Sequence, residues 1–197
     1  MHTNEKIILT DCDGVLLNWN DAFANWMLNI KGYHVRDSGH YDIDKRFDIT
    51  KDEATQLVKE FNESIDIGFL DPLLDAQYYV KKIHSELNYK FIVISTVGNY
   101  RLTTYFRKRN LNHVFGEDVF SDIYCLPMGS TKHAALSPYK DSGLIWIEDK
   151  PENAIEGKNL GLDALFLSQP HNHNAVLDVP KVTSWKQIYE YVKSKET

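Results

Sequence analysis

The residues best suited to chemistry are two aspartates two positions apart, Asp11 and Asp13. They follow the apolar run 6–10, which has the length of a buried strand. Gly14 comes next and permits a sharp turn. Such a pair can direct one carboxylate at a metal ion or a phosphorus atom and the other at a leaving group. A simple Asp-Gly turn after a strand is the competing interpretation.

A calcium-binding loop also begins with Asp-x-Asp, but this sequence does not fit one. Such a loop needs an oxygen-bearing side chain at its fifth position and a glutamate at its twelfth. Val15 occupies the fifth position, and no glutamate stands at the twelfth. The calcium-loop interpretation is therefore excluded.

Hydroxyl and ammonium groups follow later in the chain. Ser95 and Thr96 end an apolar run that starts at Phe91, and short hydroxyls suit hydrogen bonding to phosphoryl oxygens. Lys132 falls in the first turn of a short predicted helix, where a cation is disfavoured unless an anion is near. Taken one at a time, a turn and a solvated lysine are the simpler interpretations.

Two adjacent acids, Glu148 and Asp149, end the apolar run 144–147. Carboxylates at the end of a buried strand are costly unless they bind a metal or are capped, which favours a functional role. The carboxyl ends of parallel strands lie along one edge of a sheet, where open α/β folds bind their ligands. We therefore expect all of these groups to converge at that edge.

Strand-length apolar runs alternate with helical patterns over most of the chain. The runs are 6–10, 91–95, 144–147 and 164–168, with a weaker one at 123–126, and the helical patterns are 73–87, 99–109, 151–160 and 184–194. Asp71 and Pro72 suit the N-cap and first position of the helix that follows them. Ser184 and Gln187 form a capping box for the last helix. The pattern predicts an α/β fold with a doubly wound parallel sheet.

Residues 18–70 do not follow this alternation. An apolar stripe runs from Trp19 to Ile30 and stops at Gly32, and a capping box at Thr50 opens a second helix. We predict a helical cap at 18–70, inserted after the first strand, over an α/β core of residues 1–17 and 71–197. Its aromatic residues could contact a substrate, but Phe23 and Trp26 are expected to pack the insert itself; the others are Tyr33, Tyr41, Phe47 and, at the return to the core, Phe69.

Composition narrows the class of protein. The 197 residues carry a formal net charge of −6, which argues against a dedicated binder of duplex nucleic acid, and 43% of them are hydrophobic, as in globular domains. The two cysteines, Cys12 and Cys125, are far apart in sequence, which favours reduced thiols. No apolar run is long enough for a secretory or membrane-spanning segment, so a cytoplasmic location is expected.

Four motifs follow one another along the chain, each at a strand end: Asp-x-Asp-Gly, Ser-Thr, Lys and an acidic pair. In this order of motifs the sequence resembles the haloacid dehalogenase superfamily of aspartate-nucleophile phosphotransferases, and the resemblance covers nearly the whole chain. Within it, the position of the insert and four further segments resemble the 5'(3')-deoxyribonucleotidases. These segments are 68–72, 147–153, 169–172 and 183–185.

The resemblance implies hydrolysis of a small phosphate monoester, in the first place a nucleoside monophosphate, through an aspartyl-phosphate intermediate. Asp11 would be the nucleophile and Asp13 the acid and base. Lys132 and Ser95 would hold the phosphoryl oxygens, with a further contact from Thr96. The aromatic position matched by Phe69 would contact the base.

The resemblance also implies a metal. Asp11, Asp149 and the carbonyl of Asp13 would hold Mg²⁺, which prefers oxygen ligands, and Glu148 would bind it directly or through water. The superfamily commonly has two aspartates at the acidic pair, and the long spacing from Lys132 leaves Lys140 as an alternative. His171 could approach the site, although a polar loop is the simpler interpretation.

Several alternatives stay open from the sequence. The same chemistry could act on another small phosphate ester or on a nucleic-acid 3'-phosphate, or the domain could bind phosphate without turnover. The base, the sugar and the number of subunits, a homodimer included, are also open.

Overall fold

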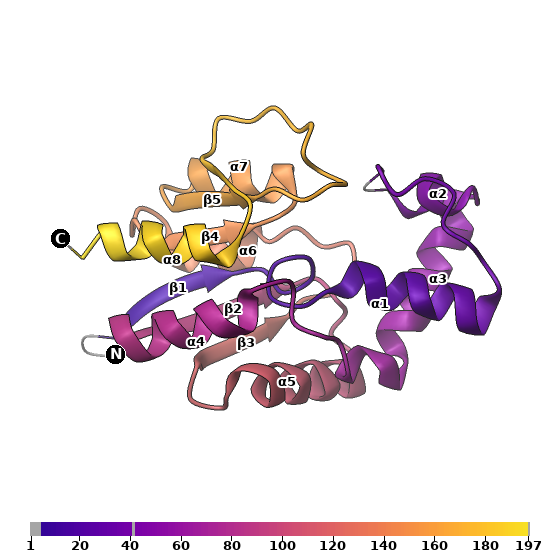
Figure 1. The fold of residues 1–197 in the computed structure, drawn as a ribbon, viewed down its shortest axis with the longest axis horizontal. Coiled ribbons are helices and arrows are strands. Elements are labelled where there is room, and N and C mark those ends of the chain that lie inside the picture. The colour runs from indigo at the N-terminus through magenta and orange to yellow at the C-terminus, as the bar shows by residue number, and fades with distance from the viewer. Residues whose placement is uncertain (1–4, 41, 197) are drawn as a thin grey trace.

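The computed structural model describes residues 5–40 and 42–196, and a six-stranded parallel sheet forms the centre of this part of the chain (Figure 1). The strands lie in the order β3-β2-β1-β4-β5-β6. The α/β doubly wound prediction is therefore confirmed, with the short last strand as an addition that the sequence pattern did not indicate. The strands are β1 (Lys6–Thr10), β2 (Tyr89–Ser95), β3 (Phe120–Cys125), β4 (Ile145–Glu148), β5 (Asp163–Leu167) and β6 (Lys181–Val182).

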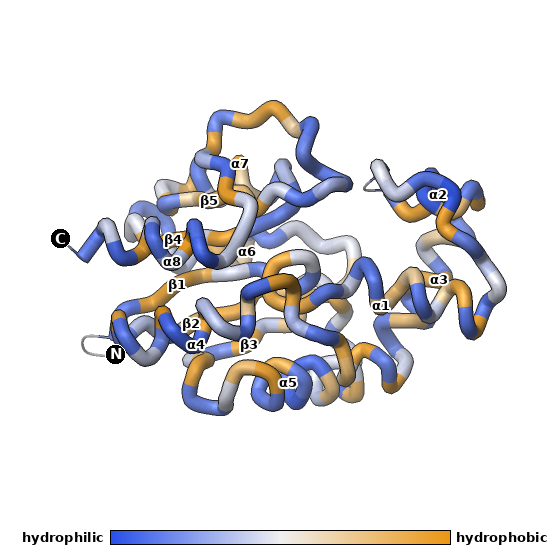
Figure 2. The backbone as a smooth tube through the Cα atoms, viewed as in Figure 1, coloured by the Kyte–Doolittle hydropathy of each residue, from blue (hydrophilic) through white to orange (hydrophobic). Residues whose placement is uncertain are grey.

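Helices cover both faces of the sheet. They are α4 (Ala76–Leu87), α5 (Arg101–Phe115), α6 (His133–Leu136), α7 (Pro151–Asn159) and α8 (Trp185–Ser194). Neighbouring strand residues point to opposite faces, so Ile8 packs in one hydrophobic cluster with α4, α5 and α8, and Leu9 packs in another with α6 and α7. Figure 2 shows the hydrophobic residues concentrated along the central strands. This two-sided burial explains why the strands read as continuous apolar runs.

The start of α4 differs from the sequence prediction. Asp71 is not its N-cap, because the helix begins five residues later, at Ala76. Residues 71–73 instead run beside the chain that leaves β1: Leu73 donates its backbone N–H to Leu16 at 2.9 Å. The carboxylate of Asp75 accepts hydrogen bonds from the first backbone N–H groups of α8, at 3.0 Å. Tertiary pairing therefore overrides the local Asp-Pro signal.

The two predicted capping boxes form in part. The Thr50 hydroxyl accepts from the Glu53 N–H, and the Ser184 hydroxyl accepts from the Gln187 N–H. Among the described contacts, neither box has its return bond. The Glu53 carboxylate accepts from the Tyr33 hydroxyl instead, and the Gln187 side chain accepts from the Thr183 N–H. The predicted helix 99–109 extends to Phe115, because its apolar face continues beyond residue 109.

The segment between β1 and α4 is helical and lies beyond the carboxyl ends of the strands (Figure 1). It contains α1 (Trp19–Trp26), a π-helical turn η1 (Met27–Lys31), α2 (Ile43–Phe47), α3 (Lys51–Glu63) and a 3₁₀ turn η2 (Ile65–Gly68). The chain enters and leaves this segment at one place, where the Asn18 N–H donates to the Asp71 carbonyl at 2.9 Å.

An aromatic cluster holds the insert together. Phe23 stacks on Trp19 with ring centroids 4.7 Å apart and meets Phe61 and Phe47 edge-on. Phe23 and Trp26 are buried, which confirms that they pack the insert itself. Tyr41 lies outside the described residues. Within residues 5–40 and 42–196, no helix combines the length and apolar character that crossing a bilayer requires.

One close contact between α7 and β4 yields a stability prediction. A Cβ atom added at Gly157 would lie 2.2 Å from Cδ1 of the buried Trp146. Gly157→Ala should therefore lower the free energy of unfolding by about 1–3 kcal/mol, the usual cost of overpacking, despite alanine's higher helix propensity. Urea denaturation measures the change. The exposed Asn159→Ala on the same helix serves as the control and should not destabilise the protein; equal stability of the two variants would contradict this packing argument.

Candidate functional site

The candidate site lies between β1 and β4, where the strand order changes direction. The chain passes from β1 to β2 on one side, whereas β4 lies on the other side of β1, which leaves a crevice at their carboxyl ends. Asp11 follows β1, Glu148 ends β4 and Asp149 follows it. Each of these three buried residues has a carboxylate oxygen, and the three oxygens lie within 4.8 Å of one another.

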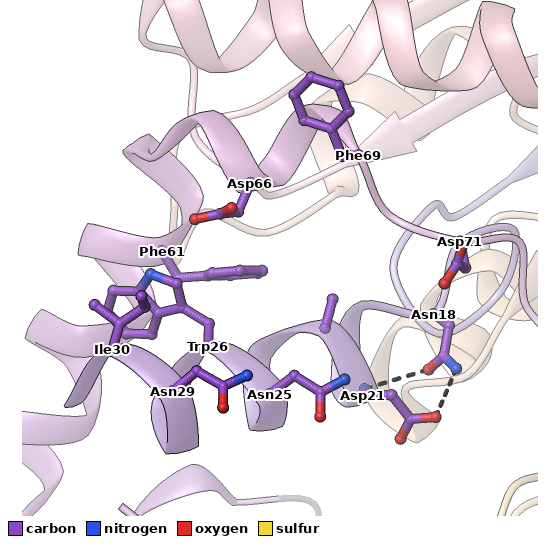
Figure 3. Close-up of a pocket in the computed structure, with 11 residues that line it drawn as sticks. Asn18, Asp21, Asn25, Trp26, Asn29, Ile30, Phe61, Asp66, Phe69 and Asp71 are labelled. Atoms are coloured by element: carbon purple, nitrogen blue, oxygen red, sulfur yellow. Dashed lines mark hydrogen bonds between the residues drawn. The ribbon is translucent and has the colours of Figure 1, made fainter. Parts of the chain in front are cut away.

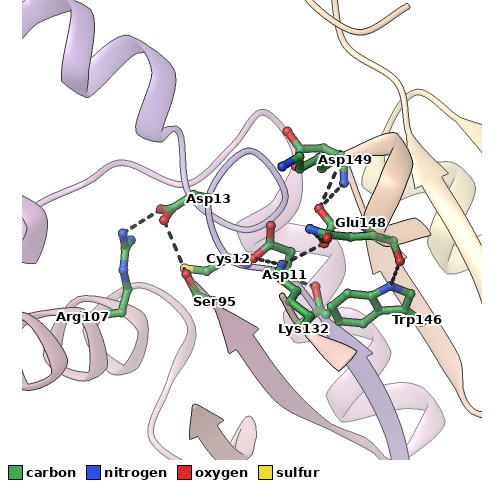
Figure 4. A network of polar contacts seen from close by, with 12 residues as sticks. Asp11, Cys12, Asp13, Ser95, Arg107, Lys132, Trp146, Glu148 and Asp149 are labelled. Carbon is green, nitrogen blue, oxygen red and sulfur yellow. Dashed lines mark hydrogen bonds and ion pairs between the residues drawn. The ribbon is translucent and has the colours of Figure 1, made fainter. Parts of the chain in front are cut away.

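Asp11 is paired with a buried lysine (Figure 4). Its Oδ1 lies 2.7 Å from Nζ of Lys132 and accepts the backbone N–H of Cys12, also at 2.7 Å. Burial, followed by the nearby Glu148 carboxylate, raises the pKa of Asp11 to about 7, although Lys132 opposes this shift. The nucleophile candidate is thus fixed in orientation and sits among more negative than positive charge.

Lys132 connects the two acidic strand ends. Its Nζ lies 2.7 Å from Asp11 and 2.8 Å from Oε2 of Glu148, over the ring of Trp146. Burial lowers the pKa of Lys132, but the two carboxylates outweigh it and raise the pKa above its usual value. Lys140 is exposed, so the structure brings Lys132 and not Lys140 to the site.

Glu148 is fully buried and uses both of its oxygens for hydrogen bonds. Oε1 accepts the backbone N–H groups of Asp149 and Lys150, and Oε2 accepts from Lys132 and from the side-chain amide of Asn153 at 3.1 Å. These contacts compensate the cost of burying the charge. Glu148 therefore orients Lys132 and the first turn after β4.

Asp149 is held by the loop that follows β5. The side chain of Asn172 donates to the Asp149 carbonyl at 2.8 Å, and Gln169 donates to Oδ2 at 3.5 Å. Nε2 of His171 lies 3.6 Å from the same oxygen. Burial raises the pKa of Asp149, with His171 opposing the shift.

Gly14 permits the close approach of these segments. Its φ of +76° lies in the left-handed region, and an added Cβ would be 2.3 Å from Oδ2 of Asp149. Its carbonyl accepts from the side chain of Gln169 at 2.5 Å. The turn after Asp13 therefore needs glycine both for its backbone angle and for space beside Asp149.

Asp13 lies on the other side of Asp11, between Ser95 and a buried arginine. Its Oδ1 is 2.7 Å from Nη2 of Arg107, and the Ser95 hydroxyl donates to Oδ2 at 3.5 Å. Burial raises the pKa of Asp13, Arg107 opposes this, and Asp11 adds to it. The carboxyl group is thus held at both oxygens.

Phe69, a predicted substrate-binding residue, does not lie beside Asp11 and Asp13. It lines a separate cavity of about 340 Å³ in the insert (Figure 3). Phe69 is 60% exposed and stacks with the guanidinium of Arg109 at 5.3 Å. The cavity beside Asp11 and Asp13, of about 310 Å³, is lined by Ser95 and Thr96 and, from the insert, by Trp19 and Asn62. Trp19 therefore brings an aromatic side chain of the insert to this cavity.

Cys12, next to Asp11, is unsuited to nucleophilic chemistry. It is fully buried, and this burial raises the pKa of its thiol well above the usual value. Cys12 belongs instead to the hydrophobic core.

Sequence reasoning missed Arg107. It lies in a segment of α5 rich in basic residues, where nothing in its type singles it out. Arg107 does lie on the apolar face of the helix, and polar residues on such a face usually have a buried partner. This position could have indicated its role. The other buried residues of this face are Thr103, Asn110, Leu111 and Val114.

The charges of the site favour binding of a divalent cation. Four carboxylates, of Asp11, Asp13, Glu148 and Asp149, face two buried cations, Lys132 and Arg107. When all of them are ionised, two negative charges remain uncompensated in a poorly solvated place. The same excess contributes to the raised pKa values of Asp11 and Asp149. The donor set is all-oxygen, as Mg²⁺ prefers.

No protein-family model matches the chain. An uncharacterised 32.4 kDa protein of Enterobacteria phage T4 is 22% identical over 190 residues, which span 92% of this chain and 67% of the phage protein.

Solved structures share the fold at low sequence identity. A haloacid dehalogenase-like hydrolase from Streptococcus pneumoniae superimposes with a TM-score of 0.66 at 16% identity, covering 95% of this chain and 98% of the other. A haloacid dehalogenase family hydrolase from Deinococcus radiodurans, with bound phosphate and sodium, gives 0.62 at 16%, covering 98% and 96%. A magnesium-bound putative hydrolase of this type from Bacillus subtilis gives 0.60 at 12%, covering 96% and 99%. The chain therefore has the fold of the haloacid dehalogenase-like hydrolases.

Proposed function

We propose that the protein is a Mg²⁺-dependent phosphatase of the haloacid dehalogenase type, acting on small phosphate monoesters. One observation carries the proposal: Asp11 shares Lys132 with Glu148 and lies close to the acidic pair Glu148 and Asp149, at the carboxyl ends of two adjacent parallel strands. A fold shared with phosphate-bound and magnesium-bound hydrolases supports it.

Asp11 attacks phosphorus in the proposed reaction. A bond forms between its carboxylate oxygen and phosphorus, and the bond from phosphorus to the ester oxygen breaks. Asp13 gives its proton to the departing oxygen, then takes a proton from the water that attacks the aspartyl phosphate and releases Asp11. The position of Asp13 beside the same cavity as Asp11 suits this exchange.

Lys132 and Ser95 stabilise the transferred phosphoryl group. Most catalytic stabilisation in phosphoryl transfer comes from groups that neutralise charge on the phosphoryl oxygens. Lys132 is already fixed by Glu148, so little reorganisation is needed. Thr96 lines the cavity next to Ser95 and offers a further hydroxyl.

Asp11, Asp149 and the Asp13 carbonyl would hold Mg²⁺, which would neutralise negative charge on the phosphoryl group when bound. The two oxygens of Glu148 already accept four hydrogen bonds. We therefore assign it to orienting Lys132 and the Asp149 backbone, with any contribution to the metal passing through water.

Residues 18–70 serve in this proposal as a cap that selects the substrate. Trp19 and Asn62 bring an aromatic ring and an amide to the cavity that contains Asp11, a combination that suits a nucleobase. Nucleoside monophosphates, deoxyribonucleotides first, are therefore the substrates we propose. Other small phosphate esters and nucleic-acid 3'-phosphates are the alternatives within the same assay.

A cytoplasmic location is also part of the proposal. The free thiols Cys12 and Cys125 favour the cytoplasm.

The nucleophile assignment is tested with a panel of nucleoside monophosphates and p-nitrophenyl phosphate, with phosphate release as the measurement. Asp11→Asn should reduce kcat by at least about 10³-fold, since the attacking oxygen is lost. The thermal unfolding midpoint should stay close to that of the wild type or rise, because a buried charge is removed. The exposed Asp52→Asn in α3 is the control and should keep full activity. Retained turnover in Asp11→Asn would remove the assignment, and wild-type phosphate binding without turnover would favour the non-catalytic alternative.

The metal assignment predicts loss of phosphate release after chelation and its recovery with added Mg²⁺. Asp149→Asn should raise the Mg²⁺ concentration for half-maximal activity by about tenfold or more, because it removes a charged ligand. The exposed Glu152→Gln, three residues later, should leave the Mg²⁺ titration unchanged. An undiminished rate in the chelated enzyme would contradict the metal requirement.

Substitutions at Trp19 and Phe69 should differ in their effect on KM. Trp19→Leu should raise KM for nucleoside monophosphates about tenfold or more relative to p-nitrophenyl phosphate, because stacking on a base contributes about 1–3 kcal/mol. Phe69→Ala should change neither KM, because Phe69 lies at another cavity. Steady-state kinetics on both substrates decide the matter, and a selective effect of Phe69→Ala would reverse our assignment.

A further inference from the structure

Arg107 is a buried cation with few partners. Its side chain is 0% exposed, and Nη2 lies 2.7 Å from Oδ1 of Asp13. Among the described residues, Nε, Nη1 and Nη2 all lack a hydrogen-bond acceptor, so the contact with Asp13 is an ion pair. A guanidinium carries five N–H donors, so its burial with a single carboxylate is costly and calls for an explanation other than stability.

The neighbouring polar residues of α5 have structural explanations that Arg107 lacks. The Thr103 hydroxyl donates to the Asn62 carbonyl at 2.9 Å, and Asn110 exchanges two hydrogen bonds with the backbone of Leu70. Both residues attach α5 to the inserted segment. Arg107 lies on the same buried stripe, and within residues 5–40 and 42–196 Asp13 is its one ion-pair partner.

The ion pair distinguishes the two oxygens of Asp13. Oδ1 is fully buried beside Arg107, whereas the Asp13 side chain as a whole is 24% exposed and lines the cavity. Oδ2 is the oxygen near Ser95. The arginine therefore fixes the rotation of the carboxyl group so that Oδ2 is presented on the side of the cavity.

We infer that Arg107 is the positioning residue for Asp13 and selects Oδ2 as the oxygen that exchanges protons with the substrate. The inference rests on the proposed phosphatase function. In the first step the bond from phosphorus to the ester oxygen breaks while the proton on Oδ2 moves to that oxygen. Arg107 keeps all of its own protons and acts only through Oδ1.

The dependence of rate on the leaving group tests this role. p-Nitrophenolate departs without a proton, whereas the alkoxide of ethyl phosphate needs one. Arg107→Met, at fixed pH and saturating Mg²⁺, should lower kcat/KM for ethyl phosphate about 10²-fold more than for p-nitrophenyl phosphate. Arg107→Lys should recover part of this difference, because an ammonium can still contact Oδ1. If Arg107→Met does not fold, Arg107→Gln and Arg107→Lys carry the comparison.

Asn110→Ala is the matched control, because it removes a buried polar contact of α5 without touching Asp13. It should lower stability and change both esters by the same factor. Equal losses on both esters in the folded Arg107 variants, or no loss, would overturn the inference. A wild-type protein that hydrolyses neither of these esters nor any nucleoside monophosphate would instead reject the proposed function.

Discussion

The structure depends on placing four carboxylates and two cations in a poorly solvated crevice. Asp11 and Glu148, at the ends of buried strands, share Lys132, and Asp13 pairs with Arg107 of α5. Removing such charges from water costs several kcal/mol per ion, which pairing offsets only in part. The proposed binding of a cation and an anionic group therefore explains the arrangement better than stability does.

Packing beneath the crevice makes this arrangement possible. Trp146 lies under Lys132, donates its indole N–H to the Asn153 carbonyl at 3.1 Å, and leaves room for helix α7 only because residue 157 is glycine. The rigid sheet supplies the precision, since parallel strands hold Asp11 and Glu148 at adjacent ends. Positioned groups of this kind need little rearrangement during a reaction, which is the main source of electrostatic catalysis.

Much of the site can be predicted from the sequence because its residues are marked by the short segments in which they occur. Each of Asp11, Ser95 and Glu148 directly ends or follows an apolar run, and a parallel sheet brings such ends to one edge whatever the order of its strands. Signals that depend on long-range packing were misread or missed. Asp71 pairs with the chain leaving β1, so α4 starts later than its Asp-Pro pattern indicates. Phe69 faces a different cavity, and its place on the chain gave no sign of this.

Helix α5 joins the insert and the site through one buried stripe. Thr103 and Asn110, seven residues apart, bind the backbone of the insert at Asn62 and Leu70, and Arg107 between them binds Asp13. Residues three and four apart share one face of a helix, so these three side chains lie on one face of α5. Since Asn62 also lines the cavity, this wall of the cavity and the carboxyl group of Asp13 are attached to the same helix. Helix α5 therefore holds the insert and the Asp13 carboxyl group in a fixed relation to each other.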